Sequence, residues 1–230
     1  RDVAPSRGLG DVYKRQILIY IKFLISRRSI MKQFLCSIAI RPDLSKVDYF
    51  YPDDPAKTIV HSCFPAISMI ANAGIKHGDE LIVTPVVTNS STSEANLNAF
   101  IAELTALEAK HNIKFTVEEP IRVELKETTA KHIAFFKSVS RSYKKGAELY
   151  IDLTFGSKVQ AISIFQSLCV AESNGCHVKE LLYGSYIKSE ADAGKGSIYS
   201  LRSLYEITQL LNTYSMLPDT DLEKLLDSVG

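Results

Sequence analysis

The residues best suited to chemistry lie together in the stretch YIDLTFGSKVQAI, at positions 150–162. An apolar run reaches an aspartate, a short turn follows, and a helical pattern opens directly after the turn. These positions supply six candidate ligand-binding residues: Asp152, Thr154, Phe155, Gly156, Ser157 and Lys158.

An anion could bind where this helical pattern begins. The first turn of a helix presents free N–H groups and the positive end of the helix dipole. Gly156 would let a ligand approach the backbone closely, and the neighbouring hydroxyls and Lys158 would add donors. The alternative is an ordinary strand-to-helix turn, in which a hydroxyl caps the helix and the lysine is solvated.

Other site types lack their motifs. The chain has no Walker loop and no G-x-G-x-x-G pattern, so neither nucleotide hydrolysis nor nicotinamide binding is indicated. Its five histidines show no metal spacing, and its cysteines show no CxxC spacing: they are Cys36, Cys63, Cys169 and Cys176. We therefore expect no metal and no cofactor, and we assign no catalytic residue.

The candidate residues must be positioned by alternating strands and helices. The predicted strands are 33–40, 79–87, 113–119 continued by 121–125, 148–154 and 177–186. The predicted helices are 58–73, bent at Pro65, then 94–111, 128–143, 157–173 and 200–214, with loops at 41–57 and 187–199. This order predicts an α/β fold: a Rossmann-like, doubly wound, mostly parallel sheet of about five or six strands with helices on both faces.

Ligands bind such a sheet in the crevice beyond the carboxyl ends of its strands. Three further candidates follow predicted strands at that edge. Arg41 would either meet a phosphate or be solvated, and the two outcomes are evenly balanced. Asn89 and Ser90 could contact a ligand, although capping the next helix is the favoured role for this pair.

Several pieces together resemble the CRISPR-associated Rossmann fold (CARF) domains, in the branch marked by an Asp-x-Thr-His-Gly signature. The signature corresponds to Asp152–Gly156, and LLYGSY (181–186) is similar to that branch's strand ending in an aromatic residue and glycine, which adds Tyr183 and Gly184 as candidates. The segment 198–215 resembles the helix that follows. The likeness covers Met31 to about Met216, with one departure: the signature's histidine is Phe155, which cannot transfer a proton.

The resemblance implies a sensor of cyclic oligoadenylate, with four or six adenylates, in a type III CRISPR antiviral response. It also implies a homodimer that holds the ring across its two-fold axis, since a symmetric ring matches an isologous interface. The alternatives are a ring nuclease that cleaves the ligand in the same pocket, a transcriptional regulator of this type, or a generic Rossmann nucleotide-binding enzyme. Phe155 could stack on an adenine or simply pack, so enzymatic activity is left open.

The first 30 residues do not resemble native protein. The codons GAT-GTG-TAT-AAG-AGA-CAG encode Asp11–Gln16 and resemble a transposase adaptor used in sequencing libraries. Arg27–Ser29 can be encoded by a ribosome-binding sequence just before Met31, which we expect to be the natural start. A membrane-anchoring helix is the alternative, but the apolar run 17–25 is shorter than the roughly 20 residues that cross a bilayer.

We accordingly expect a ligand-sensing domain at 31–216, followed by a linker or the start of an effector domain at 217–230. Without the first 30 residues the chain carries 20 Lys and Arg against 24 Asp and Glu. Binding to long nucleic acid depends on many cationic phosphate contacts, so a domain of net charge −4 argues against it. We also expect a cytoplasmic protein with no membrane partner.

We predict that the chain begun at Met31 folds as stably as the chain begun at Arg1, because residues 1–30 are expected to add nothing to the core. Thermal unfolding of the two proteins, recorded side by side by circular dichroism, checks this. An insoluble product from Met31 beside a folded product from Arg1 would contradict it.

Overall fold

The computed structural model describes residues 30–186 and 194–214. Residues Arg1–Ile30 and Met31–Gly230 separate into two units, and the fold described here is that of the second. The boundary between the units falls at the expected start, Met31. The assignment of residues 1–30 to read-through stays a prediction.

The centre of the fold is a parallel sheet. Its strands are β1 (Met31–Ser37), β4 (Glu80–Thr88), β5 (Phe115–Val117), β6 (Ile121–Val123), β7 (Glu148–Asp152) and β8 (His177–Tyr186). The spatial order is β8-β7-β1-β4-β5. Strand β6 also pairs with β4, along the part of β4 that follows its pairing with β5. The chain thus starts in the middle, builds outward on one side, and returns to build outward on the other. That order is the Rossmann arrangement, so the predicted doubly wound fold is confirmed.

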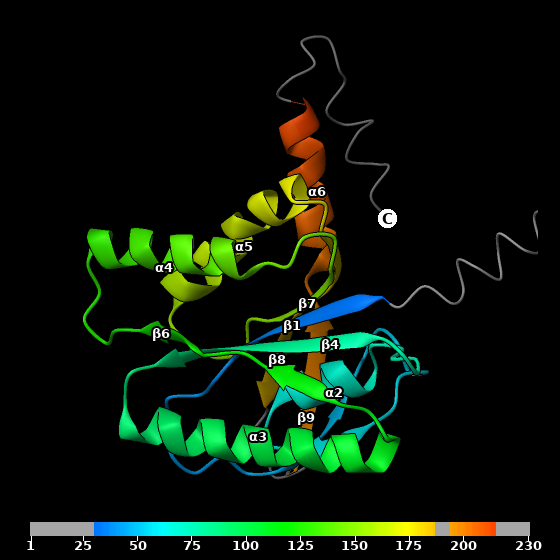
Figure 1. Cartoon of the computed structure of the whole chain (residues 1–230). Coiled ribbons are helices and arrows are strands. Elements are labelled where there is room, and N and C mark those ends of the chain that lie inside the picture. The colour runs from blue at the N-terminus through cyan, green and yellow to red at the C-terminus, as the bar shows by residue number, and fades with distance from the viewer. Residues whose placement is uncertain (1–29, 187–193, 215–230) are drawn as a thin grey trace, which may run out of the picture. The chain divides into compact units, whose positions relative to one another are not determined.

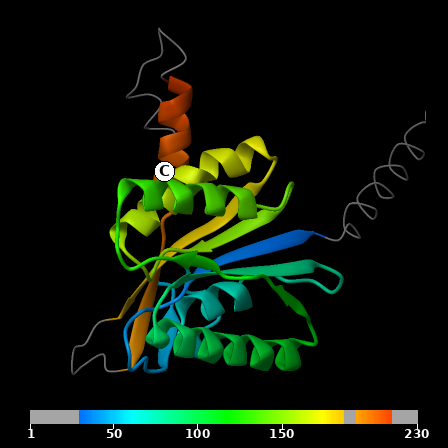
Figure 2. The ribbon, with the colours of Figure 1, turned by 60° about the vertical axis from the view of Figure 1, so that its left-hand side comes forward.

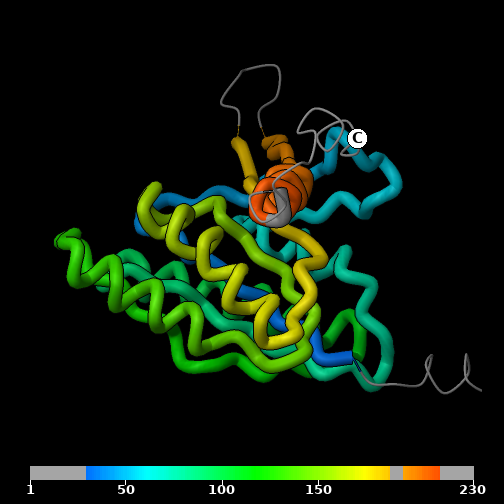
Figure 3. Tube along the Cα trace, turned by 90° about the horizontal axis from the view of Figure 1, so that it is seen from above, coloured from blue at the N-terminus to red at the C-terminus, as the bar shows by residue number. Residues whose placement is uncertain are grey.

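Helices cover both faces of this sheet (Figure 1). On one face lie α2 (Pro65–Ala71) and α3 (Ser91–His111), and on the other lie α4 (Thr129–Ser142), α5 (Lys158–Ser173) and α6 (Arg202–Tyr214). Successive residues of β1 supply the two cores: Phe34 packs with the α2 and α3 side and Leu35 with the α4 and α5 side. This alternation follows from the two-residue period of a strand. Seen from above, α4 and α5 run side by side while α6 is viewed along its axis (Figure 3).

Three strands lie outside the predicted ones. They are β2 (Val47–Phe50), β3 (Val60–Ser62) and β9 (Lys195–Ser200), and they raise the described sheet to nine strands rather than five or six. Two of them, β2 and β9, fall in predicted loops. Strand β2 has four residues and runs parallel to β9, far along the chain, whereas β9 forms a hairpin with its neighbour β8. A parallel pairing between such distant segments leaves no local signal.

Two helices begin further along the chain than the sequence predicts. The first half of the predicted helix 58–73 contains strand β3, and α2 begins at Pro65. Proline fits the first helical position because it lacks the N–H that a helix start leaves unused. The last helix begins at Arg202, since 195–200 belongs to β9. Among the described residues, no helix combines the length and hydropathy needed to cross a membrane.

Candidate functional site

The predicted crevice lies at the carboxyl ends of the central strands β1 and β7, where the strand order reverses. From β1 the chain runs first to β2 and β3, beyond β9, and returns through α2 to β4, whereas from β7 it crosses through α5 to its neighbour β8. Ligands of open α/β sheets bind at such a switch in strand order. The loop after β1 carries Arg41, and the turn after β7 is the segment Leu153–Ser157. The fold therefore brings two sets of candidate residues to the same edge.

Arg41 and Phe155 meet across this edge. The guanidinium of Arg41 lies 5.9 Å from the centroid of the Phe155 ring, within the range of a cation–π contact. On its other side, Phe155 packs edge-on against the buried ring of Phe64, with centroids 6.4 Å apart. Phe155 thus joins the hydrophobic core to the exposed Arg41, and its ring remains partly exposed.

The loop after β1 is held from α3. The side-chain amide of Asn96 donates to the carbonyl oxygens of Ala39 at 2.8 Å and of Arg41 at 3.0 Å. These two bonds fix the backbone that carries the Arg41 side chain. Asn96 belongs to no motif, so the sequence alone gave no reason to include it.

Asp152, the first residue of the signature, is fully buried. Its Oδ1 accepts the backbone N–H of Thr154 at 2.8 Å and also the hydroxyl of Thr154. The same hydroxyl oxygen accepts the backbone N–H of Gly184 at 2.8 Å. The carboxylate therefore shapes the turn from beneath and, through Thr154, ties the end of β7 to β8.

Burial raises the pKa of the Asp152 carboxyl to about 6, although hydrogen bonds from Thr154 and the nearby Ala66 N–H oppose the shift. Asp152 Oδ2 has no hydrogen-bond partner among the described residues. Beside it on β1, burial and then the charge of Asp152 raise the pKa of the Cys36 thiol. A buried carboxyl and a buried protonated thiol do not reach a ligand, so this pair supports the turn from inside the core.

Gly184 and Gly156 are both required by close packing. A Cβ at Gly184 would lie 2.4 Å from Pro65 Cγ, because the start of α2 presses against β8 there. A Cβ at Gly156, whose φ is +100°, would lie 2.1 Å from Gln160 Oε1. Gln160 holds that place because it completes a capping box with Ser157, in which each side chain binds the other's backbone N–H.

Ser157 and Ser90 both cap helices, which was the alternative to ligand binding for Ser157 and the favoured role for Ser90. Ser157 caps α5, and Ser90 caps α3 by accepting the Ser93 N–H at 3.1 Å. Asn89 donates to Glu124 Oε1 at 2.8 Å, across the ends of β4 and β6. Gln160 was missed by the sequence analysis, although the Ser-x-x-Gln spacing of a capping box signals it.

Two candidate cations stay available at this edge. Lys158 opens α5 and is exposed, and Arg41 is exposed beyond β1. Within residues 30–186 and 194–214, neither side chain forms an ion pair with a carboxylate. The edge therefore combines two free positive charges, an aromatic face and the amides of a helix start, which suits binding of an anion that carries flat rings.

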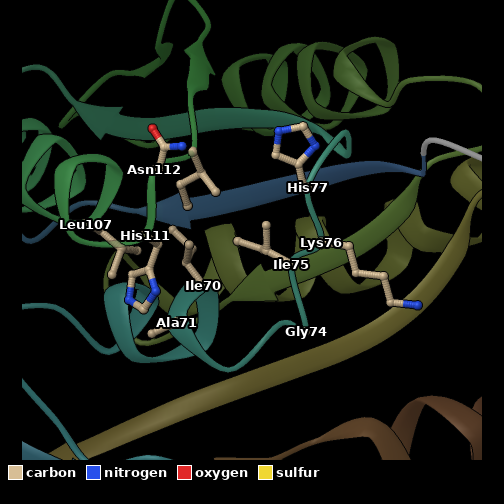
Figure 4. A pocket seen from close by; sticks show the side chains of 10 residues that line it. Ile70, Ala71, Gly74, Ile75, Lys76, His77, Leu107, His111 and Asn112 are labelled. Carbon is tan, nitrogen blue, oxygen red and sulfur yellow. The ribbon is translucent and has the colours of Figure 1, made fainter. Parts of the chain in front are cut away.

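A hollow away from this edge is lined by none of the candidate ligand-binding residues. It has a volume of about 290 Å³ and lies near the ends of α2 and α3, with an apolar floor that includes Ile70 and Leu107 and a rim that includes His77 and His111 (Figure 4). Loops entering β4 and β5 border it, so it lies at the amino edge of the sheet. Of the residues that the structure describes, no group of three or more His, Cys, Asp or Glu side chains is arranged to hold a metal ion.

Comparison with known proteins identifies no family for this chain. No family model and no curated protein matches the chain. Among solved structures, a mutant of phosphofructokinase-2 from Escherichia coli is similar at 12% identity with a TM-score of 0.32. The match covers 64% of this chain and 52% of that one, so the chain spans about half the length of that enzyme. A likeness at this level carries no argument about function.

We predict that the charge on Asp152 destabilises the fold. The folded protein keeps this proton up to about pH 6, whereas the unfolded chain releases it near pH 3.8. The raised pKa therefore contributes stability that is complete below about pH 4 and lost as the pH rises through about 6, by roughly 3 kcal/mol. Urea unfolding of wild type and Asp152→Asn between pH 4.5 and 7.5 measures the difference.

Asn can keep both Oδ1 bonds of Asp152 without the charge, so the variant should gain on wild type as the pH rises. The exposed Asp53 offers a control, Asp53→Asn, that removes one carboxylate from the surface. A constant difference between wild type and Asp152→Asn across the range would show that the carboxyl is not shifted.

We predict that Gly156→Ala destabilises the protein more than Gly146→Ala. Both glycines have positive φ, but nothing lies within 4 Å of a Cβ at Gly146, whereas Gln160 Oε1 occupies the place at Gly156. Left-handed strain costs about 1–2 kcal/mol at either site, and displacing the Gln160 side chain from its capping-box hydrogen bond adds about 0.5–1.5 kcal/mol at Gly156. Urea unfolding measures both.

A double-mutant cycle isolates the overlap. In a Gln160→Ala background the excess cost of Gly156→Ala should shrink to that of Gly146→Ala, because the clashing atom is gone. Additive effects of Gly156→Ala and Gln160→Ala would mean that the side chain of Gln160 does not fill this space.

Proposed function

We propose that this domain is a sensor of cyclic oligoadenylate and that it binds the ring at the carboxyl edge between β1 and β7. The observation that carries the proposal is the meeting of Arg41 and Phe155 at that edge, beside the start of α5. Phosphates of the ligand would meet the Arg41 guanidinium, the Lys158 ammonium and the first amides of α5. The resemblance to CARF domains, centred on Asp152–Gly156, supplies the ligand class.

The charge of the domain supports a local anion site of this kind. Residues 31–230 carry an excess of acidic side chains, so a broad basic surface cannot hold the ligand. Affinity would instead come from a few local groups, such as Arg41 after β1 and Lys158 at the start of α5. In this proposal the domain acts in the cytoplasm, where the ligand is made during an antiviral response, and regulates an effector.

The proposal includes a homodimer. The helices α5 and α6 leave large apolar side chains on the surface: Ile162 is 57% exposed and Leu204 is 56% exposed. A second copy could cover them, and a two-fold axis would let two crevices share one symmetric ring. Light scattering with and without ligand tests this part separately.

Binding without cleavage is the better-supported activity. Phe155 replaces the histidine of the signature, and the carboxyl of Asp152 is buried beneath the turn. Neither offers a proton to a phosphodiester at the surface. In this proposal the ring is bound and released intact.

We predict that Arg41→Ala and Lys158→Glu each lower the affinity for cyclic tetra-adenylate by about tenfold or more. Each removes or reverses a charge beside the proposed phosphates, and hydrogen bonds to charged groups contribute about 1.5–3 kcal/mol. Isothermal titration calorimetry measures the affinities, and chromatography of the recovered ligand tests whether it stays cyclic.

Lys137→Glu is the matched control, since Lys137 is an exposed lysine on α4. Equal losses of affinity in all three variants would mean that the net charge of the protein, rather than a local site, causes the effect. Rapid linearisation of the ligand would identify a ring nuclease. A wild-type protein that ignores cyclic tetra- and hexa-adenylate but binds a nucleoside cofactor would identify a generic Rossmann enzyme.

A further inference from the structure

The hairpin of β8 and β9 extends beyond the carboxyl end of the neighbouring strand β7. Pairing between β7 and β8 ends at Asp152 opposite Leu182, but β8 continues to Tyr186. The extra residues pair with β9 instead, up to Tyr186 opposite Gly196. The hairpin therefore extends past the carboxyl end of β7, beside the turn after β7. It touches that turn directly, through the bond from the Gly184 N–H to Thr154 Oγ1.

Two tyrosines stand directly opposite each other on this wall. Tyr183 of β8 pairs with Tyr199 of β9, and they are 45% and 37% exposed. Their neighbours Leu182 and Ile198 belong to the core on the α2 side. Alternation along each strand therefore points both tyrosines to the opposite face.

The described helices leave these rings accessible. The helix α6 follows β9 and extends away from the hairpin rather than across it (Figure 2). Opposed residues on neighbouring antiparallel strands have Cβ atoms about 4.5–5.5 Å apart, so the two side chains start side by side on one face of the hairpin. Tyr199 falls in the predicted loop 187–199, and the structure places it in β9.

Paired aromatic side chains on neighbouring strands are a known way to hold bases. In RNA recognition motifs, aromatic residues on adjacent strands of an open sheet stack two or three bases. Stacking tolerates any base because every base has a π-face. Such a surface suits an anionic ligand here, because Lys158 opens α5, which covers the same face of the sheet as the two tyrosines. Arg41 lies with Phe155 at the α2 side of the same edge.

We propose that Tyr183 and Tyr199 form a stacking platform for two nucleobases of a single-stranded or cyclic adenylate. The inference rests on the proposed function, since it names how the bases of the same ligand are held. The phosphates lie toward the turn after β7, and two successive bases lie on the hairpin. The platform adds a residue, Tyr199, that no motif marks.

The absence of tryptophan from the chain makes a direct test possible. Tyr183→Trp and Tyr199→Trp each introduce a single tryptophan that can still stack. Titration of either variant with cyclic tetra-adenylate should quench its emission, whereas tripolyphosphate, which has charge but no base, should not. Quenching by both compounds to the same extent would show that the reporters sense charge, which overturns the platform.

Affinity provides the second readout. By calorimetry, Tyr183→Ala and Tyr199→Ala should each weaken binding of cyclic tetra-adenylate about tenfold, whereas Tyr→Phe at either position should change it less than twofold, because the ring is retained. Ile133→Ala, which removes an exposed apolar side chain from α4, is the control. Urea unfolding of each variant confirms that the protein remains folded.

The outcomes separate this inference from the proposed function. Tight binding of cyclic tetra-adenylate with unchanged tryptophan emission and unchanged affinity in the alanine variants would overturn the platform alone. Quenching by linear tri-adenylate without any binding of cyclic adenylates would support the platform and overturn the sensor. If both alanine variants convert a dimer to a monomer but the tryptophans are never quenched, the two rings contact a second copy and the platform is wrong.

Discussion

The buried carboxylate of Asp152 is the interaction on which the candidate site depends. One oxygen, Oδ1, receives the N–H and the hydroxyl of Thr154, and that hydroxyl oxygen receives the N–H of Gly184. These hydrogen bonds therefore link three segments: the end of β7, the turn after it, and the last part of β8. A shared acceptor of this kind leaves the turn little freedom to move relative to the hairpin.

The cost of this arrangement is the desolvation of a carboxyl. Its pKa rises to about 6, and Oδ2 has no partner among the described residues. A charge that is destabilising for the fold but fixes a turn beside a crevice is typical of a functional site, where local strain or burial is tolerated for the sake of geometry. The close contacts around Gly156 and Gly184 have the same character, since each leaves no room for a Cβ.

The chemistry of the edge follows from which groups remain free once these contacts are made. Thr154, Ser157, Ser90 and Asn89 are engaged in structural hydrogen bonds. Arg41, Lys158 and the exposed part of Phe155 are left to face a ligand. The signature residues thus divide into those that build the turn and those that it presents. Cations and an aromatic ring are groups that suit recognition of a nucleotide.

The sequence by itself determined the fold class and the local structure of the helix starts. Alternating apolar runs specified the parallel core strands, and short-range hydrogen bonds placed Ser90 and Ser157 as caps within a few residues of their partners. Only the tertiary structure decided what lies beside what. The contact of Arg41 with Phe155, the burial of Asp152 and the pairing of Tyr183 with Tyr199 join parts of the sheet that strand order brings together. Strand order depends on pairings between distant segments, and β2 and β3, of four and three residues, depend for their stability on their partners rather than on their own sequence.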